Sequence, residues 1–308
     1  MKTLHQFTRN GINTLGDLRD ALRLAMQLEF ATIPPYLSAK WSIKFDPDRV
    51  EGVLHHIVGQ EMNHLALAGN LLTAIGGKPR IARKGFLPKY PLKELPGGVE
   101  QKLPIALKPL SFDQLAVFMQ IEYPEFPPVA AAPSALVPAT IGEFYDAIII
   151  AFQRIRPNIL KNANSVPVIL ATPILTLDDA ISTLVRIKTE GEGLQDSPQQ
   201  PTSEGSALAH YYLFKEIYRQ RRLVETPEGW TFSGSQTAFP EVYDFAKRKK
   251  HPLLRLQFRK AITCLLIELD ECWRNGCALN LATMFKVDGL GRELVRLGVS
   301  PEFRWQRS

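Results

Sequence analysis

Glu61 and His64 are ionisable residues on the apolar face of a predicted helix. That face repeats at three- and four-residue spacing through Leu54, Ile57, Val58, Leu65, Ala68, Leu71, Leu72 and Ile75. Side chains three residues apart on a helix project side by side, so this carboxylate and imidazole converge inside the protein. Burying a carboxylate costs free energy unless it gains an ion pair, a proton or a bound cation. Glu-x-x-His on an inward face is also the half-site of di-iron helix bundles, so the pattern favours a metal site.

A third candidate ligand, Glu29, lies in the preceding predicted helix, residues 15–43. Thr14 with Asp17 fits the pattern of a capping box and predicts the start of this helix. Two prolines at 34–35 remove backbone donors and are expected to kink or widen it. Glu29 falls within the apolar stripe of the helix, which comprises Leu22, Ala25, Met26, Ile33 and Tyr36.

The two helices are predicted to form an antiparallel hairpin, the second helix covering residues 48–75. Asp46 is the expected N-cap of that helix and Pro47 its first residue. Glu29 lies about 17 residues before Asp46 and Glu61 about 15 after it, so both carboxylates reach a similar height. Without a metal, a buried glutamate could instead pair with an arginine or a backbone amide, and a buried histidine could be a hydrogen-bonded core residue.

A di-iron bundle also needs one glutamate and a second Glu-x-x-His from another helix pair, and the sequence has no second motif. The best substitutes are Glu143, and either Glu190 or Glu192 combined with His210. A polar insert, residues 195–206, separates those carboxylates from His210. If the insert loops out, as a lid or an unstructured excursion, carboxylate and imidazole lie about one turn apart.

Each substitute also has an ordinary structural explanation. Glu143 fits a capping box with Thr140, and Glu192 lies in a glycine-rich break where a solvated carboxylate is common. His210 precedes aromatic residues that can bury it as a core histidine.

Four other residues near these positions are interpreted as structural. Glu122 and Glu125 flank a proline and are assigned to a turn or to contacts behind the ligands. Tyr36 and Tyr123 can line a pocket, although aromatic packing is the simpler use.

The remaining pattern is helical, without strand alternation longer than a few residues and without internal repeats. We therefore predict an all-α protein: a core in residues 1–222 with long inter-helix loops, and a C-terminal helical extension in residues 223–308 that packs on it as one continuous domain. Further helices are expected over 111–122, 140–156, 176 to a break at 189–193, 207 onward, 253–273 and 278–297.

The composition indicates a folded protein: 308 residues, 45% hydrophobic and 22% charged. No apolar run is long enough to span a membrane and the N-terminus lacks the apolar core of a signal peptide, so we expect a cytoplasmic protein without a membrane partner. Three clustered cysteines predict neither a disulfide framework nor a zinc site, and Cys264 is interpreted as a core residue.

The net charge of +6 comes largely from one Pro/Gly-rich loop, residues 78–93. This loop has neither helical periodicity nor interleaved aromatic residues, so we interpret it as solvated and expect no nucleic-acid partner. It could still attract an anionic small substrate.

The chain resembles the bacterial ferritin-like family that includes a domain of the iminophenylpyruvate dimer synthase of violacein biosynthesis. The similarity covers about residues 15–220 and implies a ferritin-like four-helix bundle. It also implies six metal ligands, with Glu192 preferred to Glu190: Glu29, Glu61, His64, Glu143, Glu192 and His210. The motifs that carry the resemblance are Leu28-Glu-Phe-Ala-Thr-Ile-Pro-Pro-Tyr-Leu, Gln60-Glu-Met-Asn-His-Leu-Ala-Leu-Ala-Gly-Asn-Leu-Leu, Ile121-Glu-Tyr-Pro-Glu, Gly142-Glu-Phe-Tyr, Gly191-Glu-Gly and His210-Tyr-Tyr-Leu-Phe-Lys-Glu-Ile.

Four glutamates and two histidines would hold two ferrous ions in a neutral site, or two manganese ions. Glu29, Glu61 and His64 are expected to hold one ion, and Glu143, Glu192 and His210 the other. We expect an oxygen-activating oxidase or oxygenase that uses dioxygen and a small organic, amino-acid-derived substrate of secondary metabolism. The alternatives are a non-enzymatic metal-binding or scaffold protein, and a single metal at the first three residues. A homo-oligomer is left open.

Overall fold

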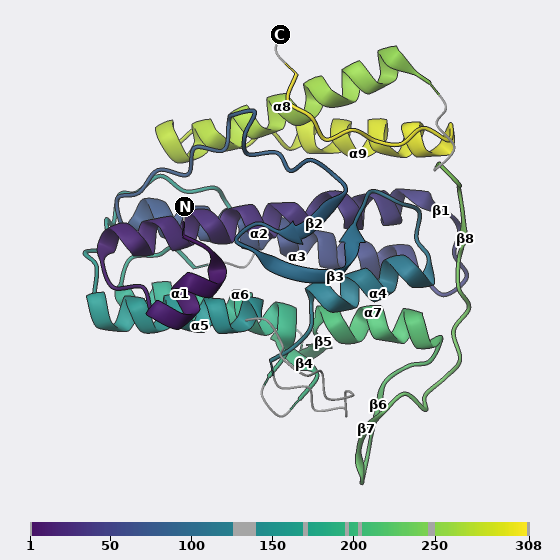
Figure 1. The fold of residues 1–308 in the computed structure, drawn as a ribbon, viewed down its shortest axis with the longest axis horizontal. Coiled ribbons are helices and arrows are strands. Elements are labelled where there is room, and N and C mark those ends of the chain that lie inside the picture. The colour runs from purple at the N-terminus through teal and green to yellow at the C-terminus, as the bar shows by residue number, and fades with distance from the viewer. Residues whose placement is uncertain are drawn as a thin grey trace.

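The computed structural model describes residues 2–125, 140–168, 172–194, 197–202, 205–245 and 250–306. These residues form a predominantly helical protein with four small two-stranded antiparallel sheets (Figure 1). The helices are α1 (Leu4–Asn10), α2 (Leu15–Ser42), α3 (Val50–Ala74), α4 (Phe112–Ile121), α5 (Ile141–Ile155), α6 (Leu177–Glu192), α7 (His210–Arg219), α8 (Pro252–Asn275) and α9 (Leu281–Arg296). The strands are β1 (Ile43–Phe45), β2 (Leu92–Leu95), β3 (Val99–Ile105), β4 (Gln199–Thr202), β5 (Gly205–Leu208), β6 (Val224–Thr226), β7 (Gly229–Thr231) and β8 (Glu241–Val242).

The helices lie in three layers (Figure 1). The middle layer is the predicted antiparallel hairpin of α2 and α3, which pack closely along their length. On one side, α4 and α5 follow each other along one line of the bundle, and α6 and α7 follow each other along the next. The helix pairs α4/α7 and α5/α6 pack against each other, so two long helices of a four-helix bundle are each replaced by two shorter ones. The third layer is the α8–α9 hairpin on the far side of α2 and α3.

Helix α2 continues through Pro34 and Pro35. Pro35 cannot donate to the carbonyl of Ala31, which lies four residues earlier. The hydroxyl of Tyr90 donates to that carbonyl instead, at 2.7 Å. A distant side chain therefore replaces a missing backbone donor in the part of α2 that follows Glu29.

The start of α3 differs from the prediction. The helix begins at Val50, so Pro47 is not its first residue. Asp46 still stabilises this end, because its carboxylate accepts hydrogen bonds from the backbone amides of Val50 and Glu51, at 2.8 and 2.7 Å. The tight turn places it within reach of two amides that have no partner inside the helix.

The polar insert differs from the prediction as well. Helix α6 runs to Glu192 and ends at Gly193, whose φ of 87° is easily adopted only by glycine. Strands β4 and β5 pair in and just after the insert, up to Leu208, so α7 begins at His210 and not at residue 207. The connection between the predicted helices over 111–122 and 140–156 lies mostly outside the described residues, since 126–139 are not among them.

Two tryptophans join the α8–α9 hairpin to the middle layer. Trp273 of α8 packs on Gly69 of α3, and its indole nitrogen donates to the Asn70 side chain at 2.8 Å. Trp41 of α2 packs on Gly291 of α9 in the reciprocal arrangement. A methyl group at either glycine would overlap the facing indole ring. The glycines therefore allow the two helix pairs to approach each other closely.

Gly69→Ala is expected to destabilise the protein by about 1–3 kcal/mol. The added Cβ would lie 2.3 Å from Cζ2 of Trp273, so the indole must move. Urea unfolding measures this change in the free energy of unfolding. Gly59→Ala on the same helix is the matched control, because its Cβ would meet nothing within 4 Å and should cost nothing. Equal midpoints for the two variants would contradict the packing argument.

Two of the three cysteines, Cys264 and Cys272, lie on α8. Cys264 is exposed and Cys272 is buried, so the interpretation of Cys264 as a core residue is wrong. Cys264 lies within an apolar run of α8 but on an exposed part of that helix, so its apolar neighbours in the sequence do not bury it. All three cysteines are free thiols.

None of the described helices combines the length and the hydrophobicity that a membrane-spanning helix requires.

Candidate metal centre

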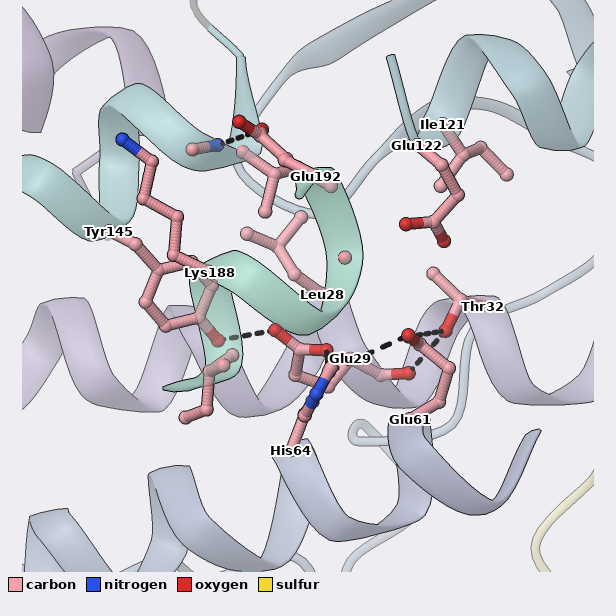
Figure 2. Close-up of a pocket in the computed structure, with 14 residues that line it drawn as sticks. Leu28, Glu29, Thr32, Glu61, His64, Ile121, Glu122, Tyr145, Lys188 and Glu192 are labelled. Carbon is pink, nitrogen blue, oxygen red and sulfur yellow. Dashed lines mark hydrogen bonds and ion pairs between the residues drawn. The ribbon is translucent and has the colours of Figure 1, made fainter. Parts of the chain in front are cut away.

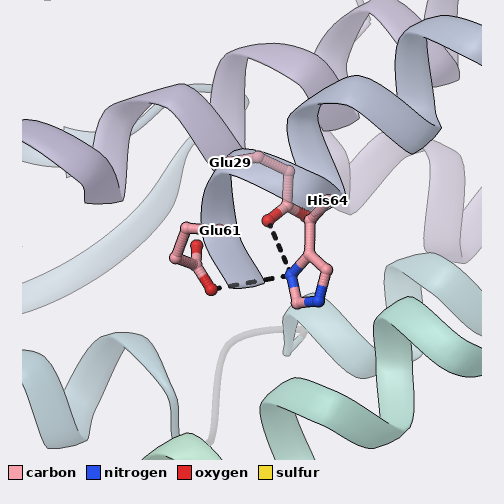
Figure 3. A group of neighbouring side chains, drawn as sticks. All are labelled: Glu29, Glu61 and His64. Atoms are coloured by element: carbon pink, nitrogen blue, oxygen red, sulfur yellow. Dashed lines mark ion pairs between the residues drawn. The ribbon is translucent and has the colours of Figure 1, made fainter. Parts of the chain in front are cut away.

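The first group of candidate ligands comes from the α2–α3 hairpin (Figure 3). Nδ1 of His64 lies 3.4 Å from Oε2 of Glu29 and 3.6 Å from Oε1 of Glu61. Each of the three residues offers one ligand atom, and these atoms lie within 4.8 Å of one another. The structure therefore brings together the three residues that the helical spacing placed at one height.

A second group shares Glu61 with the first. Nδ1 of His210, the first residue of α7, lies 3.1 Å from Oε1 of Glu61 and 3.4 Å from Oε2 of Glu122. Glu122 is the C-cap of α4. The same oxygen of Glu61 thus faces both histidines, and the two imidazole rings lie 5.9 Å apart. The whole cluster is buried, with exposed fractions from 0% for His210 to 8% for Glu122.

The outer nitrogen of each imidazole has an acceptor. Nε2 of His64 lies 2.8 Å from a carboxylate oxygen of Glu190, in the last turn of α6. Nε2 of His210 lies 3.0 Å from Oε1 of Gln60, whose amide nitrogen donates to Gln200. These contacts place a proton on both Nε2 atoms, so in a neutral imidazole the lone pair is on Nδ1.

This tautomer provides a test of whether a metal ion fits. Both Nδ1 atoms face carboxylate oxygens, and lone pairs facing oxygens repel unless a proton or a cation lies between them. Nδ1 of His210 is buried and makes no hydrogen bond, since its contacts with Glu61 and Glu122 are close without hydrogen-bond geometry. Oxygen and imidazole donors suit iron and manganese. The residues of the cluster therefore fit divalent ions of this kind.

Without a metal, protons take the place of cations at the histidines. Burial lowers the pKa of His210, but the carboxylates of Glu122 and Glu61 outweigh burial and raise it to about 9. The same opposition holds at His64, where burial is outweighed by Glu190 and the neighbouring glutamates, so its pKa lies well above the ordinary value. The metal-free cluster is thus expected to hold imidazolium ions.

The carboxylates divide into two kinds. Burial raises the pKa of Glu29 and of Glu122, and the negative charge of Glu61 raises both further. Burial also acts to raise the pKa of Glu61, but the nearby imidazoles of His210 and His64 favour its ionised form, outweigh burial and bring the pKa well below the ordinary value. Glu61 is therefore the carboxylate that stays ionised between the two histidines.

Three hydroxyl groups contact the same carboxylates from the other side. Tyr145 donates to Glu29 and Thr32 donates to Glu61, as Figure 2 shows. Tyr36 donates to Glu122 at 2.5 Å. All three donors are buried. The glutamates are thus held on two sides, by imidazoles and by hydroxyls.

A small cavity adjoins the cluster (Figure 2). It has a volume of about 30 Å³, which is room for a few atoms and not for an organic substrate. Its apolar lining includes Leu28, Ile121, Ile141 and Ile187. Lys188 also lines it and forms ion pairs with Glu125 and Asp146, at 3.0 and 2.6 Å.

The comparisons with known proteins agree with this architecture. A family model described as ferritin-like matches residues 22–219. The chain belongs to the ferritin-like family. No curated protein matches it. A crystal structure of a ferritin-like protein from Caulobacter vibrioides is similar, with a TM-score of 0.71 and 24% identity over 95% of this chain and 99% of that one. At that identity the similarity shows the fold, and the predicted all-α, ferritin-like fold is confirmed.

Within this ferritin-like bundle, two of the six predicted ligands lie outside the clusters. Glu143 is exposed and forms the capping box with Thr140 that was its structural alternative. The carboxylate of Glu192 lines the cavity but turns away from His64, accepting from the backbone amides of Gly142 and Glu125 at 2.7 and 3.3 Å. Burial raises its pKa to about 7. Among the described residues, neither belongs to a group of candidate ligands.

Glu122 and Glu190, which were not among the six predicted ligands, are carboxylates that contact the two histidines. Glu122 was interpreted as a turn residue, and it is indeed a helix cap, but its side chain points into the bundle beside His210. Glu190 was set aside in favour of Glu192, yet it is Glu190 that contacts His64. The signals that could have identified them are the Ile121-Glu-Tyr-Pro-Glu motif and the apolar stripe of α6, in which Glu190 follows Ala180, Leu184 and Ile187.

Glu143→Ala is expected to leave metal content unchanged and to cost about 1 kcal/mol of stability. Its carboxylate accepts one of the two hydrogen bonds of the α5 capping box, and the net contribution of one hydrogen bond has that magnitude. Elemental analysis of the metal-loaded protein and urea unfolding measure the two quantities. A fall in metal content would return Glu143 to the ligand set.

Proposed function

We propose that the chain is a di-metal carboxylate protein that binds two ions of iron or manganese and acts as an oxygen-activating oxidase or oxygenase. Glu29, Glu61 and His64 would hold one ion, and Glu61, Glu122 and His210 the other. The observation that carries this proposal is the single oxygen of Glu61 that faces two buried Nδ1 atoms, one of them without a hydrogen-bond partner.

When bound, two such ions supply electrons for the reduction of dioxygen. The chain itself fixes the ligands and excludes water. Glu190 and Gln60 hold the two imidazoles in the tautomer whose Nδ1 is free to bind. The burial of all five ligands removes competing water and strengthens each interaction within the cluster.

We propose a small organic, amino-acid-derived substrate, used in secondary metabolism in the cytoplasm. Support comes from the apolar cavity lining and from the resemblance of the ligand-bearing motifs to the violacein-pathway domain. Lys188 lines the same cavity and would attract a carboxylate group, although Glu125 and Asp146 now neutralise it. A substrate of this size needs more space than about 30 Å³, so binding would require rearrangement at the cavity.

Aerobic reconstitution with ferrous iron tests the proposal. We expect two irons per chain by elemental analysis, oxygen consumption on mixing, and a new absorption band in the near-ultraviolet. An anomalous-scattering map of crystals loaded with iron would identify the ligands directly. One iron per chain would support a mononuclear site at Glu29, Glu61 and His64. No bound iron would support a scaffold.

The small cavity favours one alternative, a ferritin-like protein that binds metal without an organic substrate. That protein would consume oxygen in proportion to added iron and then stop. An oxidase would continue to consume oxygen when a substrate and a reductant are supplied. Oxygen uptake beyond one equivalent per di-iron centre therefore separates the two.

A further inference from the structure

Each glutamate of the cluster uses its two oxygens differently. Oε1 of Glu29 accepts from Tyr145, and Oε2 faces His64 at 3.4 Å. Oε1 of Glu122 accepts from Tyr36, and Oε2 faces His210 at 3.4 Å. The two outer carboxylates of the cluster therefore have the same arrangement, one oxygen on a tyrosine hydroxyl and the other toward an imidazole.

Glu61, the shared carboxylate, follows the same rule with a threonine. Its Oε2 accepts from the hydroxyl of Thr32 at 2.6 Å, while Oε1 faces both histidines. The hydroxyl of Thr32 also lies 2.7 Å from the backbone carbonyl of Glu29. A hydroxyl has only one hydrogen, so the contact with Glu61 is the stronger one when that carboxylate is ionised.

The positions of the donors show that the arrangement is built into the bundle. Glu29, Thr32 and Tyr36 recur at three- and four-residue spacing on one face of α2, so this helix supplies a ligand and two donors. Tyr145 comes from the second turn of α5. Tyr36 and Tyr145 are at most 1% exposed, so water cannot replace either hydroxyl without a change in packing.

We infer that Tyr145, Thr32 and Tyr36 are positioning residues that restrict Glu29, Glu61 and Glu122 to binding metal through one oxygen each. This inference rests on the proposed di-metal site. A carboxylate with both oxygens free can bind an ion through both. Because a hydroxyl binds the second oxygen, each glutamate would offer one oxygen to a metal ion, and Glu61 would offer the Oε1 atom that faces both histidines. Fewer protein oxygens on the ions would leave room for dioxygen.

Tyr145→Phe and Tyr36→Phe test the inference, because each removes one hydroxyl and keeps the ring. Tyr212→Phe is the matched control: Tyr212 is also fully buried, and its hydroxyl has no hydrogen-bond partner among the described residues. The probe is Co²⁺ alone, titrated into each metal-free protein. Calorimetry gives the two affinities, and the visible absorption of Co²⁺, which weakens as its coordination number rises, reports the ligand geometry.

In each tyrosine variant we expect two bound Co²⁺ ions, one of them held about 10- to 100-fold more weakly, because contacts behind metal ligands have effects of that size. We also expect weaker visible absorption per ion, as the freed oxygen joins the coordination sphere. Tyr212→Phe should match the wild type in both. Thr32→Val should repeat the spectral change, and Thr32→Ser, which keeps a hydroxyl, should restore the wild-type spectrum.

The outcomes separate this inference from the proposed function. If the wild type binds two ions and the two tyrosine variants match it in spectrum and affinity, the inference is overturned and the proposed function stands. If the wild type binds no Co²⁺ or iron, both are overturned. Melting temperatures of the metal-free proteins identify a variant that fails to fold, in which case the other tyrosine variant and the threonine pair decide.

Discussion

Glu61→Ala is expected to abolish binding of both metal ions, whereas Glu29→Ala and Glu122→Ala should each abolish or weaken only one. The reason is geometric: Oε1 of Glu61 is the only carboxylate oxygen of the described clusters that faces both Nδ1 atoms. Elemental analysis after loading with ferrous iron under anaerobic conditions gives the number of ions per chain. We expect two for the wild type, close to none for Glu61→Ala, and one for each of the other variants.

Glu143→Ala is the control for this series, because it also removes a glutamate but one that lies outside the cluster. Circular dichroism of the metal-free proteins establishes that each variant is folded. If Glu61→Ala kept one tightly bound ion, the two groups would be independent sites, and the proposed di-metal centre would be wrong.

The affinity of the protein for metal ions is expected to rise steeply with pH. A metal ion binds neutral imidazole, but the pKa of His210 is raised to about 9 and that of His64 lies well above its ordinary value. Below about pH 9 the ion held by His210 must therefore displace at least one proton, and the ion held by His64 must displace one wherever the pH is below the raised pKa of that imidazole. For each proton displaced, the apparent affinity should increase about tenfold per pH unit. Competition with a chelator between pH 6 and 9 measures it.

The stability of the metal-free protein should change in the opposite direction. The pKa of His210 is higher in the folded than in the unfolded chain, so its contribution to stability is complete below about pH 6.5 and is lost as the pH rises through about 9. Metal-free protein should therefore melt at a lower temperature at pH 9 than at pH 6.5, while loaded protein should not. If the affinity for metal ions were constant between pH 6 and 9, the histidines of the metal-free protein would have to be neutral over that range.

The sequence predicted one half of the candidate site much better than the other. Glu29, Glu61 and His64 lie on two helices joined by a short turn, so local spacing and a count of residues were enough to place them side by side. Glu122 and His210 lie at helix ends, next to segments that interrupt the regular repeat. No periodicity extends across such a segment, so the preference for Glu143 and Glu192 followed from motif position alone. The helices themselves, with their caps at Thr14, Ser111, Thr140 and Thr176, were recognisable because capping is local.

The broken helices also bear on the order in which the protein folds. The contact between Thr32 and Glu61 spans 29 residues, whereas that between Tyr36 and Glu122 spans 86 and that between Gln60 and His210 spans 150. Closing a longer loop costs more chain entropy, so contacts between distant segments tend to form later. The α2–α3 hairpin can therefore assemble three ligands early, and a nascent chain could capture its first ion before the residues that hold the second have been synthesised.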